Sequence, residues 1–142
     1  GFLDELLNRI IPQVELSLPQ PPAWRGIAGY SLAGLFSLWA LWQTDAFDRA
    51  ASASGSLWFP GFIDYVHEHA MAVTPDAVYL SLGKKETKTP NRMMRHVLDD
   101  TRAMEALLVE RGIPTKLELN PGNHFAQTDL RMGRGIHWML TH

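Results

Sequence analysis

A sharp turn at Ser31, between a predicted strand and a predicted helix, constrains the fold of this chain more than any other stretch. The apolar run at residues 24–28 predicts a strand, and a helical pattern extends from the serine to about Trp42. A serine at the apex of such a turn, with small residues on both sides, is the layout of a nucleophile elbow. The apex backbone is strained, so bulky residues two positions away would collide with the strand or the helix. Gly29 fits this pattern, whereas Ala33 stands where glycine is commoner.

Composition narrows the class of protein. The length of 142 residues suggests one domain over residues 1–142, and 46% hydrophobic residues are enough to form a core. A net charge of −2 gives no basic surface for nucleic acid. No run of about 18 apolar residues predicts a membrane span. The absence of cysteine excludes disulfides and thiolate metal sites. We expect a cytoplasmic protein, unless a signal segment lies upstream of Gly1.

Strand patterns alternate with helical patterns along the chain. An amphipathic helix is predicted at residues 2–14, and Pro12 is expected to kink or end it. Strands are predicted at residues 24–28, 47–54, 77–82 and 115–119, and helices at 31–42, 60–71, 89–112 and 129–140. The helix at 31–42 is apolar nearly all round and should be buried. The helix at 89–112 is expected to begin at Thr89, with Pro90 in its first turn. This alternation predicts an α/β fold, a four-stranded parallel sheet flanked by helices.

Candidate catalytic side chains follow three of the predicted strands. Ser31 follows the first strand, Glu86 the third and His124 the fourth. The carboxyl ends of parallel strands meet at one edge of the sheet, so these side chains should gather there. A serine hydroxyl needs a base, and the base needs an orienting acid. We therefore expect Ser31 as nucleophile, His124 as base and Glu86 as acid, in the chain order of α/β-hydrolases.

Plainer interpretations compete with these assignments. Glu86 lies beside Lys84 and Lys85 and is also explained as a solvated loop residue, which would leave a Ser–His dyad. His124 is also explained as a surface histidine in a turn. His67 and His69 are two residues apart and do not share a helix face, so no metal site is predicted.

The remaining parts of such a site are an oxyanion hole and a substrate pocket. The backbone N–H of Leu32, at a helix N-terminus, is the expected oxyanion donor. A second donor normally comes from a loop after an earlier strand, and this sequence has no such strand. We therefore expect the chain to be the carboxyl-terminal part of a longer enzyme, weakly active or inactive alone.

Three residues are the candidates for substrate binding: Tyr30, Ser56 and Trp58. Ser56 and Trp58 follow the second predicted strand at the edge where the catalytic candidates gather. Trp58 and its neighbour Phe59 would form an apolar wall of the pocket. A partner-binding surface explains these loop aromatics equally well.

Four segments together resemble the putative-esterase family of the α/β-hydrolases, which includes esterase D-like enzymes and siderophore (enterochelin-type) esterases. The segments are residues 27–35, 52–58, 80–86 and 121–125. The resemblance implies hydrolysis of a small-molecule carboxylic ester by Ser31 and His124, with the acid at or near Glu86 and no cofactor. Ala33 departs from the family's commoner glycine. The family's amino-terminal half, with several strands and the oxyanion loop, has no counterpart in this chain.

The function predicted from the sequence is therefore that of a serine esterase with a partial, carboxyl-terminal α/β-hydrolase fold. An acyltransferase on the same scaffold and a non-catalytic binding domain are the alternatives. The first strand is normally internal in this family, so here it should present an unpaired edge. We expect the isolated chain to self-associate through that edge or to be marginally stable.

Overall fold

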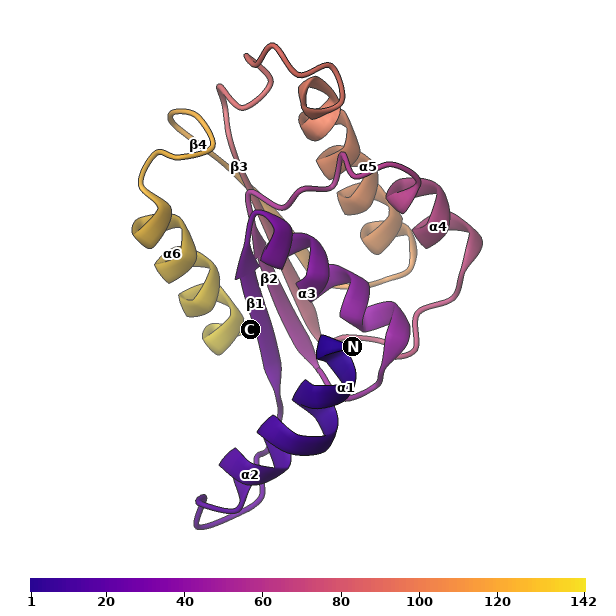
Figure 1. Ribbon diagram of the computed structural model, residues 1–142, viewed down its shortest axis with the longest axis vertical. Helices are drawn as coiled ribbons and strands as arrows, with labels where there is room; N and C mark the ends of the chain where they lie inside the picture. Colours follow the sequence, from indigo (N-terminus) through magenta and orange to yellow (C-terminus); the bar gives the residue numbers. More distant parts are fainter.

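A parallel sheet of four strands forms the centre of the computed structural model, which describes residues 1–142 (Figure 1). The strands are β1 (Gly26–Tyr30), β2 (Arg49–Ala53), β3 (Ala77–Gly83) and β4 (Thr115–Asn120). They lie in the order β1-β2-β3-β4, and each neighbouring pair is parallel. All carboxyl ends therefore lie at the same edge of the sheet, and the predicted fold class is confirmed.

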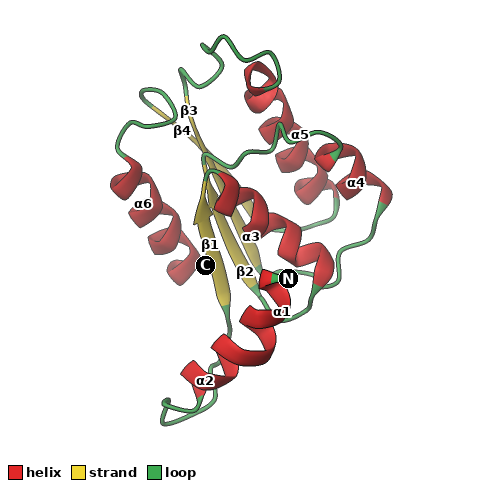
Figure 2. Ribbon diagram, in the orientation of Figure 1, coloured by secondary structure: helices red, strands yellow, loops and turns green.

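Helices cover both faces of the sheet (Figure 2). On one face lies α6 (Thr128–Thr141), and on the other lie α3 (Leu32–Gln43), α4 (Phe62–Glu68) and α5 (Val97–Glu110). The amino-terminal helix consists of α1 (Phe2–Glu5), a π-helical turn (Leu6–Ile10) and α2 (Ile11–Glu15). It packs beside α3, where the Phe2 and Phe36 rings lie 5.5 Å apart. None of these helices combines the length and the apolar character needed to cross a bilayer.

Successive strand residues supply two separate hydrophobic clusters. Ala50 and Val78 pack in the larger cluster with α3, α4 and α5, whereas Ala51 and Tyr79 pack against α6. All seven residues of β3 are buried, as expected for a strand that helices cover on both faces. A Cβ at Gly135 of α6 would lie 3.1 Å from the Tyr79 ring. This glycine, which weakens the helix in isolation, lets α6 approach the sheet closely.

The amino-terminal helix continues past Pro12 and ends at Glu15. Proline lacks the N–H that an α-helix interior needs, and its ring crowds the preceding turn. In the turn just before Pro12, the Ile11 N–H donates to the Leu6 carbonyl, five residues back. A π-type turn is a common means of bending a helix without ending it. The proline therefore coincides with a local widening of the helix.

The helix predicted from Thr89 begins later, because a side chain closes a competing turn. Asn91 Oδ1 accepts hydrogen bonds from the N–H groups of Met93 at 3.0 Å and Met94 at 3.2 Å. An asparagine side chain often accepts hydrogen bonds from nearby backbone N–H groups in this way, and these bonds compete with the formation of a helix. A single 3-10 turn follows, and α5 begins at Val97. Thr89 therefore lies in a loop, and the prediction that this helix begins at Thr89 was wrong.

Candidate active site

Ser31 lies at the apex of the turn between β1 and α3, in a strained backbone conformation. Its φ is 60° and its ψ is −120°, a combination that residues other than glycine rarely adopt. The Ser31 N–H donates to the Ala53 carbonyl at 3.0 Å, and the Ser31 carbonyl accepts from Ser56 N–H at 3.0 Å. The end of β2 and the loop after it therefore hold this strained residue in place.

Two glycines make the turn sterically possible. A Cβ at Gly29 would overlap the backbone carbonyl of Ala33. A Cβ at Gly34 would lie 3.0 Å from the Gly55 Cα and 2.8 Å from the Ser52 Oγ. The Ala33 side chain is itself exposed. Alanine is therefore accommodated at this position, and Gly34 provides the close approach of α3 to the loop after β2.

The structure brings Ser31, His124 and Glu86 together in one chain of hydrogen bonds. His124 Nε2 lies 2.9 Å from Ser31 Oγ, and His124 Nδ1 lies 2.7 Å from Glu86 Oε1. The loops after β3 and β4, which carry Glu86 and His124, lie at the upper edge of the sheet in Figure 1. Three side chains that are far apart in the sequence thus meet at the edge where α/β proteins bind ligands.

Glu86 is buried, with 7% of its surface exposed. Its Oε2 accepts hydrogen bonds from Ser54 Oγ at 2.7 Å and from the Gly83 N–H. Burial by itself would raise the pKa of Glu86, but hydrogen bonds from His124, Ser54 and Gly83 hold it below its ordinary value. An ionised carboxylate only accepts hydrogen bonds, so His124 Nδ1 carries the proton and Nε2 presents its lone pair to Ser31.

Leu32, the predicted oxyanion donor, is the first residue of α3. The first N–H groups of an α-helix have no acceptor within the helix, and the helix dipole adds a partial positive charge there. The Leu32 N–H is therefore adjacent to Ser31 and belongs to this group of N–H donors.

The three predicted substrate-binding residues lie in different surroundings. Tyr30 donates a hydrogen bond to the His124 carbonyl and shares with Ser31 and His124 the lining of an open recess of about 530 Å³. Ser56 is buried, with its Oγ 3.5 Å from Ser31 Oγ. Trp58 lies with Glu86 and His124 around a separate cavity of only about 20 Å³. The open recess therefore includes Tyr30 but neither Ser56 nor Trp58.

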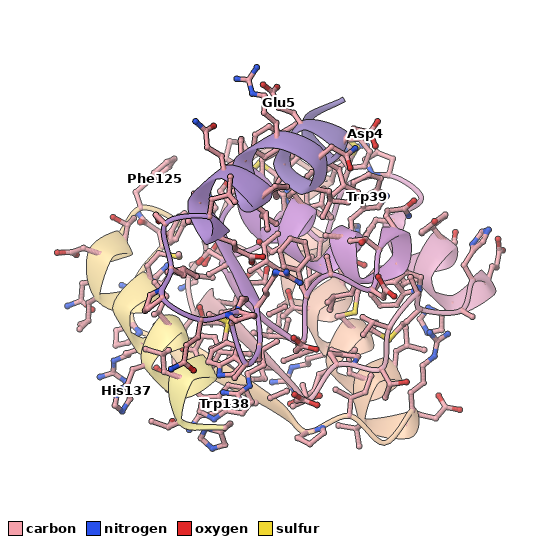
Figure 3. All side chains as sticks on the ribbon, turned by 90° about the horizontal axis from the view of Figure 1, so that it is seen from below. Asp4, Glu5, Trp39, Phe125, His137 and Trp138 are labelled. Atoms are coloured by element: carbon pink, nitrogen blue, oxygen red, sulfur yellow. The ribbon has the colours of Figure 1, made fainter.

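Phe125 stands at the rim of the open recess. It is 81% exposed and projects away from the body of the molecule near the start of α6 (Figure 3). On the same recess lie Thr128, Asp129 and Met132 of α6. The recess that contains Ser31 and His124 is thus bounded by the first turns of α6.

An apolar groove of about 430 Å³ lies between α3 and α4. It begins at Leu32, which is 64% exposed, and its lining includes Leu35, Phe36, Trp39, Phe59 and Tyr65. The prediction that α3 is buried nearly all round is therefore only partly right. The side of α3 that carries Leu38 and Leu41 is fully buried, and the other side lines this groove.

The sequence analysis missed Arg131, and it placed Ser54 only by its position at the edge of the pocket, without its contact to the acid. Ser54, at φ 46°, donates to Glu86 as described, and Arg131 of α6 is 1% exposed and lies 3.4 Å from the same carboxylate oxygen. A signal for Arg131 was present in its spacing from Gly135 and Met139, which places all three on one face of a helix. An arginine on the buried face of a helix implies a buried polar partner.

The other candidate histidines stay away from the site. His67 Nδ1 lies 2.7 Å from the Ile63 carbonyl, and His69 Nδ1 lies 2.8 Å from the Tyr65 carbonyl. Both rings therefore pair with the backbone of α4, one turn earlier.

Comparison of sequences connects the chain with one family. A family profile described as "Putative esterase" matches residues 2–128. The uncharacterized protein YbbA of Bacillus subtilis (strain 168) is 29% identical over 114 residues, which cover 78% of this chain and 46% of YbbA. The chain thus spans less than half the length of that relative.

Comparison of structures shows the same fold in longer proteins. The enterobactin esterase FES from Shigella flexneri, solved in the presence of enterobactin, matches 99% of this chain with a TM-score of 0.78 at 22% identity. The siderophore hydrolase EstA from Aspergillus nidulans matches 99% with a TM-score of 0.71 at 21% identity. The match covers 37% of the first chain and 56% of the second. At these identities the likeness establishes an α/β-hydrolase fold.

Proposed function

The chain belongs to the putative esterase family, and we propose that it carries the catalytic residues of a serine hydrolase that acts on carboxylic esters. The observation that supports this proposal most is the unbroken hydrogen-bonded chain from Ser31 through His124 to Glu86. Nucleophile, base and orienting acid in this arrangement serve acyl transfer on several unrelated folds.

In the proposed reaction, Ser31 Oγ attacks the ester carbonyl carbon while His124 Nε2 takes its proton. The tetrahedral intermediate expels the alkoxide, which receives that proton from His124 and leaves an acyl group on Ser31. Water then attacks the acyl-enzyme, with His124 again as base, and releases the acid. Glu86 holds the imidazole in the required tautomer and stabilises its protonated form.

The Leu32 N–H supports the oxyanion in both steps of the proposed reaction. The helix dipole of α3 acts in the same direction, since its positive end faces Ser31. Loss of one such donor typically lowers the rate by about 10²–10³. A second N–H donor to the oxyanion would have to come from a segment outside β1, α3 and the loops that carry Glu86 and His124.

The proposed substrates are carboxylic esters, siderophore-type lactone esters included. The two similar solved structures are named an enterobactin esterase and a siderophore hydrolase, which is the basis for naming this class. The reacting bond would lie in the recess that holds Ser31 and His124. The apolar groove that begins at Leu32 would suit an apolar part of the ester.

A fluorophosphonate probe tests the proposal. The probe should form a covalent adduct on Ser31, located by peptide mapping, and Ser31→Ala should abolish the adduct. Ser17→Ala, in an exposed turn, is the matched control and should label like the wild type. A wild-type protein that is never labelled would point to the non-catalytic binding domain. For a labelled protein, product analysis with an added acceptor alcohol separates hydrolysis from acyl transfer.

A further inference from the structure

Arg131 is the most deeply buried charged residue of the molecule. Its guanidinium contacts Glu86 and the residues next to Ser31 and His124. Only 1% of its surface is exposed, although arginine is among the residues that are almost never fully buried without partners. It lies on the inward face of α6, one turn into the helix, where its N–H donates to the Gln127 carbonyl at 2.9 Å.

The guanidinium contacts all three segments that carry the proposed catalytic residues. Nη1 lies within hydrogen-bond distance of Tyr30 Oη (3.3 Å), Ser54 Oγ (3.0 Å) and Glu86 Oε2 (3.4 Å). Nη2 donates to the carbonyls of Pro121 (3.0 Å) and Asn123 (2.8 Å). Tyr30 directly precedes Ser31, and Asn123 directly precedes His124. One planar group therefore connects the end of β1, the acid loop and the histidine turn.

The chain leaves room for this guanidinium at Gly83. A Cβ at Gly83 would lie 2.7 Å from Arg131 Nη2 and 2.9 Å from the Asn123 carbonyl oxygen. A side chain at that position would therefore collide with Arg131 or push the histidine turn away. The absence of a side chain at Gly83, the last residue of β3, therefore leaves the space that the Arg131 guanidinium occupies.

The contacts on Glu86 are divided between its two carboxylate oxygens. Arg131, Ser54 and the Gly83 N–H all meet Oε2, whereas Oε1 meets only His124. The donors on Oε2 fix the rotation of the carboxylate and keep Oε1 directed at the imidazole. The buried positive charge also balances the carboxylate, which would be costly to bury alone.

We propose that Arg131 is a positioning residue for the proposed hydrolase, and that it holds Ser31, His124 and Glu86 in their relative positions. This inference rests on the proposed function. Arginine suits the task because its rigid fork of N–H donors reaches in two directions at once. A lysine ammonium in the same place keeps the charge but is a single point, so it cannot reach the Glu86 carboxylate and the histidine turn together.

Arg131→Met and Arg131→Lys test the proposal, with Arg134→Met as the matched control. Arg134 lies on the same helix, and its partner is the half-buried Glu118 at 2.9 Å, away from the proposed catalytic residues. For p-nitrophenyl acetate hydrolysis we expect kcat to fall by about 10² in Arg131→Met, because small misplacements of catalytic groups cost rates of that order. KM should change little, since Arg131 does not line the recess that holds Ser31 and His124. Arg131→Lys should lose about tenfold in kcat, because charge alone does not restore the geometry.

A second measurement, by NMR, follows the hydrogen bond between His124 and Glu86. The proton on His124 Nδ1, bonded to Glu86, should give a downfield NMR signal, assigned by its loss in His124→Gln. We expect this signal to vanish or broaden in both Arg131 variants and to persist in Arg134→Met. Amide spectra of the core residues of α5 show whether each variant is folded.

The outcomes separate the two proposals. A wild-type protein whose Ser31 is never labelled by the fluorophosphonate overturns the proposed function, whereas the NMR signal still reports on Arg131. Slow ester hydrolysis does not overturn it, because a site with one oxyanion donor is expected to be slow. A folded Arg131→Lys protein with wild-type kcat and an unchanged signal overturns the positioning role. Should Arg131→Met fail to fold, Arg131→Lys, which keeps the charge and most of the volume, decides the matter.

Discussion

At the scale of single residues, Glu86 shows how burial and hydrogen bonding compete. Its environment would favour the neutral acid if burial acted alone, but donors on both oxygens reverse the balance and lower its pKa. The sequence context, with lysines at positions 84, 85 and 88, left a solvated loop residue as the competing interpretation. The site therefore contains an ionised, buried carboxylate whose two oxygens have different partners.

Replacement of Glu86 by glutamine should reduce kcat by about 10⁴, the order found when the acid of such a triad becomes an amide. The amide can donate a hydrogen bond to the imidazole and so favour the wrong tautomer. Ester hydrolysis at neutral pH measures the effect. Glu118→Gln is the control and should leave kcat within about twofold, because the pair of Glu118 with Arg134 is partly exposed and separate from the catalytic candidates. An unchanged kcat in Glu86→Gln would instead favour a Ser–His dyad.

The stability of the protein should depend on Glu86 in acid. The pKa of Glu86 is lower in the folded state than the ordinary value of 4.5, so the folded state binds the proton more weakly than the unfolded state. Its stabilising contribution is therefore complete above that ordinary value and is lost as the pH falls below it. Urea denaturation of wild type and Glu86→Gln at pH 7 and at about pH 3.5 should show a difference in unfolding free energy that shrinks in acid. A constant difference contradicts this account.

At the scale of elements, small residues decide how closely helices approach the sheet. Gly29 and Gly34 allow α3 to leave β1 through the turn at Ser31, and Gly135 allows α6 to lie against Tyr79. Intrinsic propensity disfavours glycine in a helix and so gives no reason for a glycine at this position. The contact with the sheet explains why a glycine stands there.

Two glycines of α6 make a matched pair for testing this explanation. A Cβ at Gly133 would have no atom within 4 Å, whereas a Cβ at Gly135 would meet the Tyr79 ring at 3.1 Å. Gly133→Ala should therefore raise the free energy of unfolding by roughly 0.5–1 kcal/mol through helix propensity. Gly135→Val should lower it by roughly 1–3 kcal/mol through overpacking. Urea denaturation measures both, and a stabilised Gly135→Val would refute the close-contact argument.

At the scale of the whole molecule, the sheet has one edge formed by β1. In this structure β1 pairs only with β2, although it carries the turn on which the proposed nucleophile stands. An edge strand presents unpaired N–H and C=O groups that can pair with another chain. The similar proteins are longer than this chain. The solved enterobactin esterase matches 99% of this chain, which corresponds to 37% of that esterase.

We propose that the isolated chain of 142 residues either associates with itself through β1 or is marginally stable. Association should appear as a molecular mass that rises with protein concentration in light scattering. The melting temperature should then rise with concentration as well, because association stabilises the folded state by mass action. A monomer that is stable to heat at every concentration would refute both alternatives.

The sequence by itself determined the order of the elements and the edge at which the candidate residues gather. Alternating strand and helix patterns are local signals, and the handedness of their connections leaves few topologies. Ser31, Glu86 and His124 were therefore expected at one edge, because each follows a strand of the same parallel sheet.

The tertiary structure alone decided what surrounds those residues. Arg131 and Tyr30 are 101 positions apart in the chain, and Glu86 and Ser54 are 32 apart, so no local pattern specifies these contacts. No local pattern specifies the space that Gly83 leaves beside the Arg131 guanidinium either. Patterns of periodicity indicate which face of an element is buried, but only the packed chain determines which atoms meet there, because burial makes each polar group depend on partners from distant segments.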